Sequence, residues 1–231
     1  MAKKTYIGVN NVARQVKKVY IGVNGVARKV KKIYIGVANI ARQIFGGGEL
    51  SYYGTATPLA EARANLAATS VGNYALFGGG LDPNSSSIVD AYNTSLTRTL
   101  PTALSEARGY LAAALVGNYA LFGGGYVSST VDAYNTSLTR STPTALLLSR
   151  GYFAATTIGD YALFGGGRLS SGKPSSIVDA YNNSLTRSTP TALSEGRDSL
   201  AATSVGDYAL FGGGYNSSNV YSSIVDAYIV D

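Results

Sequence analysis

The charged residues of this chain recur at fixed places in a long repeat, so they are the first candidates for chemistry. An Arg stands eleven residues before each of four Tyr-Ala-Leu-Phe-Gly-Gly-Gly motifs, and an Asp follows each motif in a Val-Asp-Ala-Tyr segment. These residues are Arg63, Arg108, Arg150, Arg197, Asp90, Asp132, Asp179 and Asp226. Glu61, Glu106 and Glu195 recur as well, and paired carboxylates can hydrolyse glycosidic bonds, but nothing in the sequence pairs them. We therefore predict that each Arg holds the framework together by binding backbone carbonyls or an Asp of a neighbouring repeat.

The residue types that are absent limit the chemistry further. The chain has no His and no Cys, so it lacks the commonest general base and any thiol nucleophile, thiolate ligand or disulfide. The Gly triplets are not phosphate-binding loops, because no Lys-Ser/Thr follows them. We predict a protein that is not an enzyme, with no catalytic residues, no metal site and no cofactor.

The four motifs define the architecture that must position these residues. They begin at Tyr74, Tyr119, Tyr161 and Tyr208, with spacings of 45, 42 and 47 residues, and self-similarity at such a period indicates a repeat fold. Within the copy at 108–145 we expect strands at 109–116, 119–122, 130–134 and 138–141. A Gly-Asn turn joins the first two strands, and Pro143 ends the fourth. Four short antiparallel strands per repeat are typical of a propeller blade.

This pattern resembles the kelch repeat over residues 51–231. The shared features are the Arg before the first strand, the Gly doublet that closes the second strand, and the Tyr of the third strand. The Trp that kelch units carry in the fourth strand is absent, and Arg98, Arg140 and Arg187 lie near its place. The resemblance implies an all-β, four-bladed kelch-like β-propeller. Some kelch propellers are copper oxidases, but their sites need His ligands and a Cys cross-link, so the absence of His and Cys excludes that activity here.

The last copy, from Arg197, ends before its fourth strand, while residues 50–57 have only a fourth-strand equivalent. We therefore predict closure between an N-terminal and a C-terminal strand, with residues 50–57 completing the last blade. Closure removes open sheet edges. The alternative is that two chains each contribute half of an eight-bladed ring.

Residues 1–45 contain a shorter repeat and most of the positive charge. They hold ten Lys and Arg and no acidic residue, whereas the rest of the chain has nine basic and thirteen acidic residues. Tyr6, Tyr20 and Tyr34 stand 14 residues apart, and Asn24-Gly25 between β-branched runs is a strong hairpin signal. We expect three β-hairpins in this module, and treat residues 46–50 as a Gly linker, although Gly46 to Gly48 also match the later Gly triplets.

The basic residues of the module have two possible roles: they attach the module to a partner, or they form a solvent-exposed face of the hairpins. The candidate anchor residues are Lys17, Lys18, Arg28, Lys31 and Lys32. They could dock on an acidic protein surface or on nucleic acid, although nucleic acid is the weakest reading, or they could simply be the solvated face of short strands. The Tyr-Ile-Gly-Val-x-x-x-Ala-Arg units at 6–14, 20–28 and 34–42 resemble units in virion proteins of phages and prophages. That resemblance implies a module that attaches a larger domain to other virion proteins.

The loops after the Gly triplets differ between copies, so we expect recognition there. Loops on a rigid scaffold commonly carry function, and Tyr, Ser, Asn and Gly are typical of adaptable binding surfaces. The alternative is that these are ordinary solvated loops. The candidate ligand-binding residues are Tyr126, Arg168, Lys173, Tyr215, Asn216 and Tyr221.

Together these features predict a phage virion structural protein, either a capsid decoration protein or a tail or fibre component. Domains are expected at 1–45, 46–50 and 51–231, with the propeller displaying a binding face for a host-surface glycan or protein. We expect a homo-oligomer made in the bacterial cytoplasm, with no signal peptide and no membrane partner. The alternative function is a bacterial kelch-type scaffold for protein–protein interaction.

Overall fold

The computed structural model describes residues 6–9, 12–15, 20–23, 26–29, 32–37, 40–46 and 50–230, with side chains from Leu50 onward. Every regular element in these ranges is a β-strand, and neighbouring strands pair antiparallel. The predicted all-β class is therefore confirmed. Within the same ranges no helix has the length and apolar character needed to cross a membrane. The chain divides into two compact units, Met1–Gly54 and Thr55–Asp231.

Three hairpins form the described part of the first unit. They are β1 (Tyr6–Val9) with β2 (Val12–Gln15), β3 (Tyr20–Val23) with β4 (Val26–Lys29), and β5 (Lys32–Val37) with β6 (Ile40–Gly46). Each pair is a separate two-stranded sheet, as the 14-residue repeat predicts. The expected turns at 10–11, 24–25 and 38–39 lie outside the described residues, as do residues 47–49 of the predicted linker.

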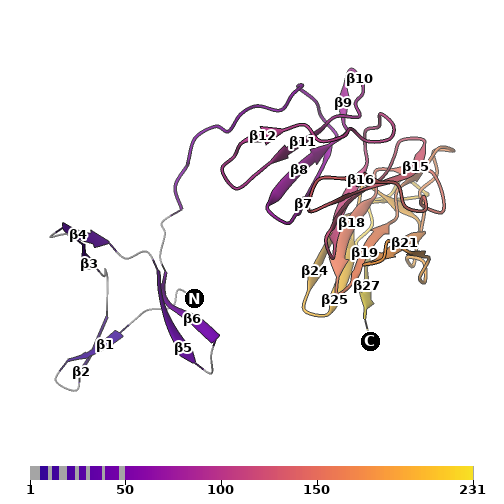
Figure 1. Cartoon of the computed structure of the whole chain (residues 1–231). Helices are drawn as coiled ribbons and strands as arrows, with labels where there is room; N and C mark the ends of the chain where they lie inside the picture. The colour runs from indigo at the N-terminus through magenta and orange to yellow at the C-terminus, as the bar shows by residue number, and fades with distance from the viewer. Residues whose placement is uncertain are drawn as a thin grey trace. The chain divides into compact units, whose positions relative to one another are not determined.

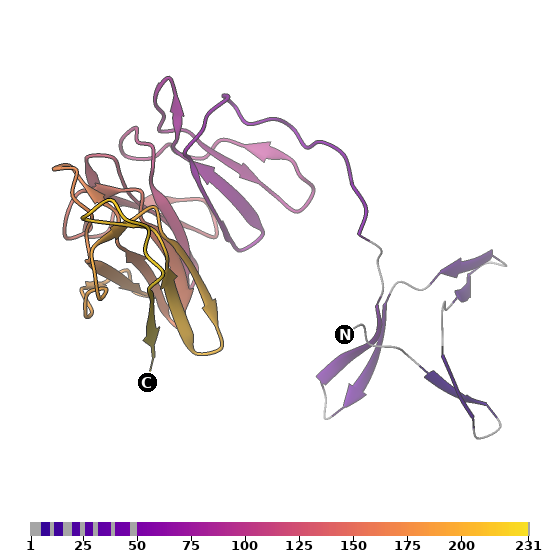
Figure 2. The same ribbon diagram turned by 180° about the vertical axis from the view of Figure 1, so that it is seen from behind.

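Four larger sheets form the second unit, one for each copy of the long repeat (Figures 1 and 2). Sheet 1 contains β7 (Ala67–Val71), β8 (Tyr74–Gly78), β11 (Val89–Tyr92) and β12 (Arg98–Thr99). Sheet 2 contains β13 (Ala112–Val116), β14 (Tyr119–Gly125), β15 (Ser128–Asn135) and β16 (Arg140–Ser141). Sheet 3 contains β18 (Ala154–Ile158), β19 (Tyr161–Gly165), β21 (Val178–Asn182) and β22 (Arg187–Ser188). Sheet 4 has three strands, β24 (Ala201–Val205), β25 (Tyr208–Gly212) and β27 (Val225–Ile229).

Short two-residue strands extend the loops beyond the sheets. They are β9 (Leu81–Asp82) with β10 (Asn84–Ser85), β17 (Arg150–Gly151) with β20 (Arg168–Leu169), and β23 (Arg197–Asp198) with β26 (Tyr215–Asn216). The last two pairs join the start of one repeat to the loop after its own Gly triplet. The loop residues predicted to recognise a ligand are therefore tied to the residues that follow the recurring Arg.

The Tyr-Ala-Leu-Phe motif forms the second strand of each sheet, and its side chains alternate between the two faces. In sheet 2 Val116 pairs with Tyr119 across the turn at Gly117, whose φ of 52° suits the primed turns that hairpins prefer. Leu121 belongs to the core cluster on one face, whereas Phe122 belongs to the cluster on the other. The strand is therefore buried on both faces and serves as framework.

The sheets stack face to face in chain order. β7 packs against β13, β13 against β18, and β18 against β24. The core between sheets 1 and 2 combines Leu76 and Val89 with Phe122 and Tyr134, and equivalent residues fill the next two interfaces. Interior positions in such cores are close-packed, so each interface fixes the angle between its two sheets.

A Phe ring fits against a Gly at each of these three interfaces. A Cβ added to Gly78 would lie 2.8 Å from the ring of Phe122 in the next sheet. The same construction at Gly123 and Gly165 gives 3.1 and 2.6 Å to the rings of the following sheets. The first Gly of each of the first three triplets is therefore required by close approach between sheets.

The predicted closure by residues 50–57 is wrong. These residues form no strand and lie exposed, and sheet 4 keeps three strands. A hollow lined by Thr191, Ala192, Ser194 and residues 226–229 lies beside the free edge of β27. Thr57, the last of these residues, is held instead on sheet 1, where its carbonyl accepts a hydrogen bond from the Tyr92 hydroxyl (2.7 Å). The carbonyl of the following Pro58 accepts one from Arg98 (2.7 Å).

Candidate functional site

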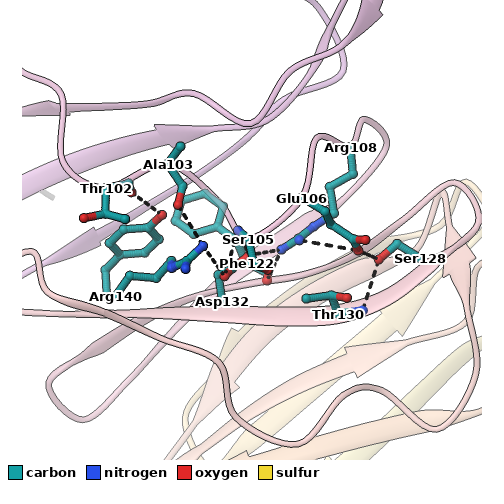
Figure 3. A network of polar contacts seen from close by, with 11 residues as sticks. Thr102, Ala103, Ser105, Glu106, Arg108, Phe122, Ser128, Thr130, Asp132 and Arg140 are labelled. Carbon is teal, nitrogen blue, oxygen red and sulfur yellow. Dashed lines mark hydrogen bonds and ion pairs between the residues drawn. The ribbon is translucent and has the colours of Figure 1, made fainter.

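The recurring Arg and Asp form ion pairs within each repeat. Arg108 donates to Asp132 Oδ2 at 2.8 Å and to the carbonyl of Phe122 at 3.0 Å, with both side chains almost fully buried (Figure 3). Arg150 lies 2.8 Å from Asp179, and Arg63 lies 2.6 Å from Asp90. The predicted binding to carbonyls is confirmed, but the Asp partner belongs to the same repeat and not to a neighbouring one. These pairs fasten the start of each repeat to its own third strand.

Each Asp also holds the segment that leads from one sheet to the next. The backbone N–H and hydroxyl of Ser105 both donate to Asp132, at 3.1 Å each (Figure 3). Arg140 on the fourth strand approaches the same carboxylate at 3.6 Å. Such buried charges need several hydrogen bonds to offset lost hydration. Burial lowers the pKa of Arg150, and the neighbouring Asp179 opposes that shift.

The recurring Glu residues also have structural partners. Ser128 donates to Glu106, Ser86 donates to Glu61 at 3.5 Å, and Ser222 donates to Glu195. Burial alone would raise the pKa of Glu106, but the hydrogen bonds and Arg108 outweigh it, so that pKa lies below its ordinary value. A carboxyl with a lowered pKa is ionised near neutral pH and is poorly suited to act as a general acid.

The residue two places after each recurring Arg lies on one rim of the sheet stack. These residues are Asn65, Tyr110, Tyr152 and Ser199, all with φ between 53° and 58°. Their backbones form a chain of hydrogen bonds, because Tyr110 N donates to Asn65 O (3.0 Å), Tyr152 N to Tyr110 O (3.1 Å) and Ser199 N to Tyr152 O (2.8 Å). Left-handed backbone at non-Gly residues is uncommon and concentrates at functional sites.

An aromatic and cationic cluster occupies this rim. The rings of Tyr110 and Tyr152 stack with centroids 4.1 Å apart, and Tyr126 meets Tyr152 edge-on at 6.3 Å. The guanidinium of Arg168 lies 5.9 Å from the Tyr152 ring centroid, within the range of a cation–π contact. Burial and hydrogen bonding to Tyr110 raise the pKa of Tyr152 to about 12. We call Tyr110, Tyr126, Tyr152, Arg168 and Asp198 the rim cluster.

A buried carboxylate orients the cation of the rim cluster. Asp198 is 1% exposed and accepts a hydrogen bond from Arg168 Nε at 2.9 Å, while the Ser199 hydroxyl donates to its other oxygen at 3.0 Å. Asp198 is also the β-sheet partner of Tyr215, whose ring lies 4.6 Å from that of Tyr221. The hydrogen bond with Tyr221 raises the pKa of Tyr215. The rim therefore carries two groups of Tyr side chains joined through Asp198.

The structure brings together some of the predicted ligand-binding residues. Tyr126 and Arg168 meet on Tyr152, and Tyr215 and Tyr221 meet each other. Asn216 instead stabilises its own loop, because its side-chain oxygen accepts hydrogen bonds from the backbone of Ser218 and Val220. Lys173 is exposed, and its carbonyl accepts a hydrogen bond from the backbone N–H of Leu169 at 2.9 Å.

Sequence reasoning missed three residues of the rim cluster: Tyr110, Tyr152 and Asp198. The signal that could have found them is the variation at the two positions after each recurring Arg, which read Ala-Asn, Gly-Tyr, Gly-Tyr and Asp-Ser. The pairing of β17 with β20 and of β23 with β26 places these positions beside the loops after the triplets. The sequence alone does not show that pairing.

The predicted anchor residues cannot be placed as a site. Lys17, Lys18 and Lys31 lie outside the described residues, and Arg28 and Lys32 are described by their backbone alone, in β4 and β5. Comparison of the whole chain with models of known protein families and with curated proteins finds no match.

Proposed function

We propose that this chain is a non-enzymatic structural protein of a phage virion, either a capsid decoration protein or a tail or fibre component. In this proposal the four sheets are blades of a kelch-like propeller, and the rim cluster binds a host-surface glycan. The hairpin unit attaches the protein to other virion proteins through its basic residues. The protein is made in the host bacterial cytoplasm and acts in the particle as a homo-oligomer.

The observation that carries the binding role is the rim cluster itself. Tyr126 is 51% exposed and the Arg168 side chain 39% exposed, so ring faces and a guanidinium are both available to a ligand. Binding sites typically combine aromatic surface with a few oriented polar groups, and Tyr supplies contact area at low entropic cost. Aromatic faces stack on the C–H faces of sugar rings, while Arg168, held by Asp198, can donate to hydroxyl groups.

A glycan array probed with the full chain tests this role. Tyr152→Ala and Arg168→Ala should each weaken binding to any glycan hit by about tenfold, which corresponds to roughly 1.4 kcal/mol. Tyr53→Ala is the matched control, because Tyr53 is 87% exposed and is not part of the cluster. Equal losses in all three variants, or an absence of glycan binding, would contradict the proposal.

Attachment to the particle is tested separately by charge reversal in the hairpin unit. Replacing Lys17, Lys18, Lys31 and Lys32 by Glu should abolish incorporation into particles while leaving glycan binding unchanged, because electrostatic docking depends on the sign of the charge. Lys173→Glu, a single reversal in the second unit, is the control. Incorporation at the wild-type level would refute the attachment role.

A further inference from the structure

In each of sheets 1, 2 and 3, one face is covered by the next sheet along the chain. The equivalent face of sheet 4 is exposed. We call this the leading face of a sheet; in sheet 1 it carries Val71 and Val89, which are 1% and 0% exposed beneath sheet 2. The equivalent residues of sheet 4 are Val205 and Val225, which are 63% and 59% exposed. An apolar sheet face therefore ends the stack without a cover in the described part of the chain.

The opposite face of sheet 1 is uncovered in the same way. We call it the trailing face, and in sheets 2, 3 and 4 its Phe is 0% exposed because it packs on the preceding sheet. In sheet 1 the equivalent Phe77 is only half-buried, and Ala75 is exposed. The stack of sheets thus exposes a leading face on sheet 4 and a trailing face on sheet 1. Faces of these two kinds pack against each other at the three interfaces inside the stack.

The packing details at the two ends also match. A Cβ added to Gly165 would meet the ring of Phe211 at 2.6 Å, but one added to Gly212 would meet only Val225 of its own sheet, at 3.4 Å. The surface at Gly212 therefore has the same shape as the surfaces at Gly78, Gly123 and Gly165, each of which packs against a Phe ring of the next sheet. Phe77 is the equivalent ring of sheet 1, and no described Gly packs against it. Shape complementarity of this kind is what well-packed interfaces share.

The backbone hydrogen bonds along the rim end in the same complementary way. Each bond runs from the N–H of one sheet's residue to the carbonyl of the preceding sheet's residue, from Tyr110 back to Asn65 and from Ser199 back to Tyr152. Among the described residues, the series leaves the Asn65 N–H at one end and the Ser199 carbonyl at the other. A further bond of the same kind would join these two groups.

The occupant that fits both faces is a second copy of this chain. Stacked repeats normally end in polar capping faces, and contiguous apolar surfaces on soluble proteins mark interaction sites. Both end faces are exposed, so they could meet within one chain only if at least one of the packed interfaces changed, whereas a second copy can bind with those interfaces unaltered. We propose that the leading face of sheet 4 binds the trailing face of sheet 1 of a second copy, head to tail. Such a heterologous contact either closes a ring or extends a filament.

Site-specific cross-linking of the full chain tests this proposal, because the protein has no Cys of its own. Ala75→Cys and Val205→Cys place single thiols at exposed positions on the two faces, so neither change should impair folding. With a short bismaleimide, each single variant alone should give no dimer, and their mixture should give one. A chain carrying both changes should give cross-linked dimers if two copies close a ring, and a ladder of larger species if the contact extends a filament.

Matched variants make the result decisive. Adding Val225→Glu to the double Cys chain should remove the intermolecular cross-linked products, because it places a charge in the apolar face. Pairing Ser95→Cys, in an exposed turn, with Val205→Cys should give no cross-link. A doubly substituted chain of monomer mass in which one linker joins both of its thiols would show that the faces of one chain meet, and would overturn the proposal. Dimers of Val205→Cys alone, or no cross-link in the mixture, would overturn it as well.

Discussion

Neutralising Asp132 tests whether the buried ion pairs hold the sheets together. Asp132 is fully buried and binds Arg108 at 2.8 Å and Ser105 at 3.1 Å. Asp132→Asn keeps the shape but leaves the Arg108 guanidinium, 1% exposed, with only the more distant Glu106 (3.8 Å) as a counter-charge. Loss of one partner from a buried pair costs about 3–5 kcal/mol, which for a domain of this size corresponds to a fall in Tm of roughly 8–16 °C.

Urea unfolding of the full chain, followed by circular dichroism, measures this loss against graded controls. Asp226→Asn should cost only about 1.5–3 kcal/mol, because the Asp226 side chain is 15% exposed and sheet 4 provides no fourth-strand Arg. Arg140→Ala should cost about 0–1 kcal/mol, since its contact with Asp132 is 3.6 Å long and its side chain is 27% exposed. Equal losses for the two Asp variants, or a loss below about 1 kcal/mol for Asp132→Asn, would refute this reasoning.

Two further predictions concern the close contact between sheets and the buried phenols. Gly165→Ala should lower the free energy of unfolding by about 1–3 kcal/mol, because its Cβ would lie 2.6 Å from the Phe211 ring. Gly212→Ala is the control and should be nearly neutral, because its Cβ would lie 3.4 Å from the nearest neighbour. Similar losses for the two variants in urea titrations would show that the Phe ring moves freely. Burial raises the pKa of Tyr152 and of Tyr228 from 10.0 to about 12, so the folded state holds these protons more tightly than the unfolded state. The stability that results is complete below pH 10 and is lost as the pH rises through about 12. Urea midpoints measured across this range should fall less steeply in Tyr228→Phe than in the wild type, and an unchanged slope would contradict the shift.

The local elements of the fold could be predicted from the sequence because they depend on neighbours along the chain. The Gly-Asn and Gly-Asp turns fix a two-residue hairpin, and the alternation of Leu121 and Phe122 places them on opposite faces. The prediction that each recurring Arg pairs with an Asp was right, but that Asp belongs to the same repeat and not to a neighbouring one. That choice depends on which third strand lies beside the Arg, and the sequence spacing is equally compatible with both.

The candidate site was only partly predictable for the same reason. Tyr126 and Arg168 could be proposed because their loops differ from the equivalent loops of other copies. Tyr152, on which both converge, lies at the start of a repeat, far from the variable loops in sequence. Its position on the rim results from hydrogen bonds between successive sheets, which no local pattern encodes. Asp198 could not be predicted as a site residue, because it acts by orienting Arg168, which lies thirty residues earlier in the chain.

The sequence by itself determined that the second unit is a series of four short-stranded antiparallel sheets without His or Cys chemistry. Periodicity and turn residues suffice for that, because strand and hairpin formation are short-range. Only the tertiary structure decided how the series ends. The stretch at 50–57 has a composition suited to a fourth strand, yet from Thr57 onward it is held on sheet 1. Sheet 4 therefore keeps an open edge, because no described strand pairs with the outer side of β27. Its apolar face stays exposed, because no described sheet packs on Val205 and Val225.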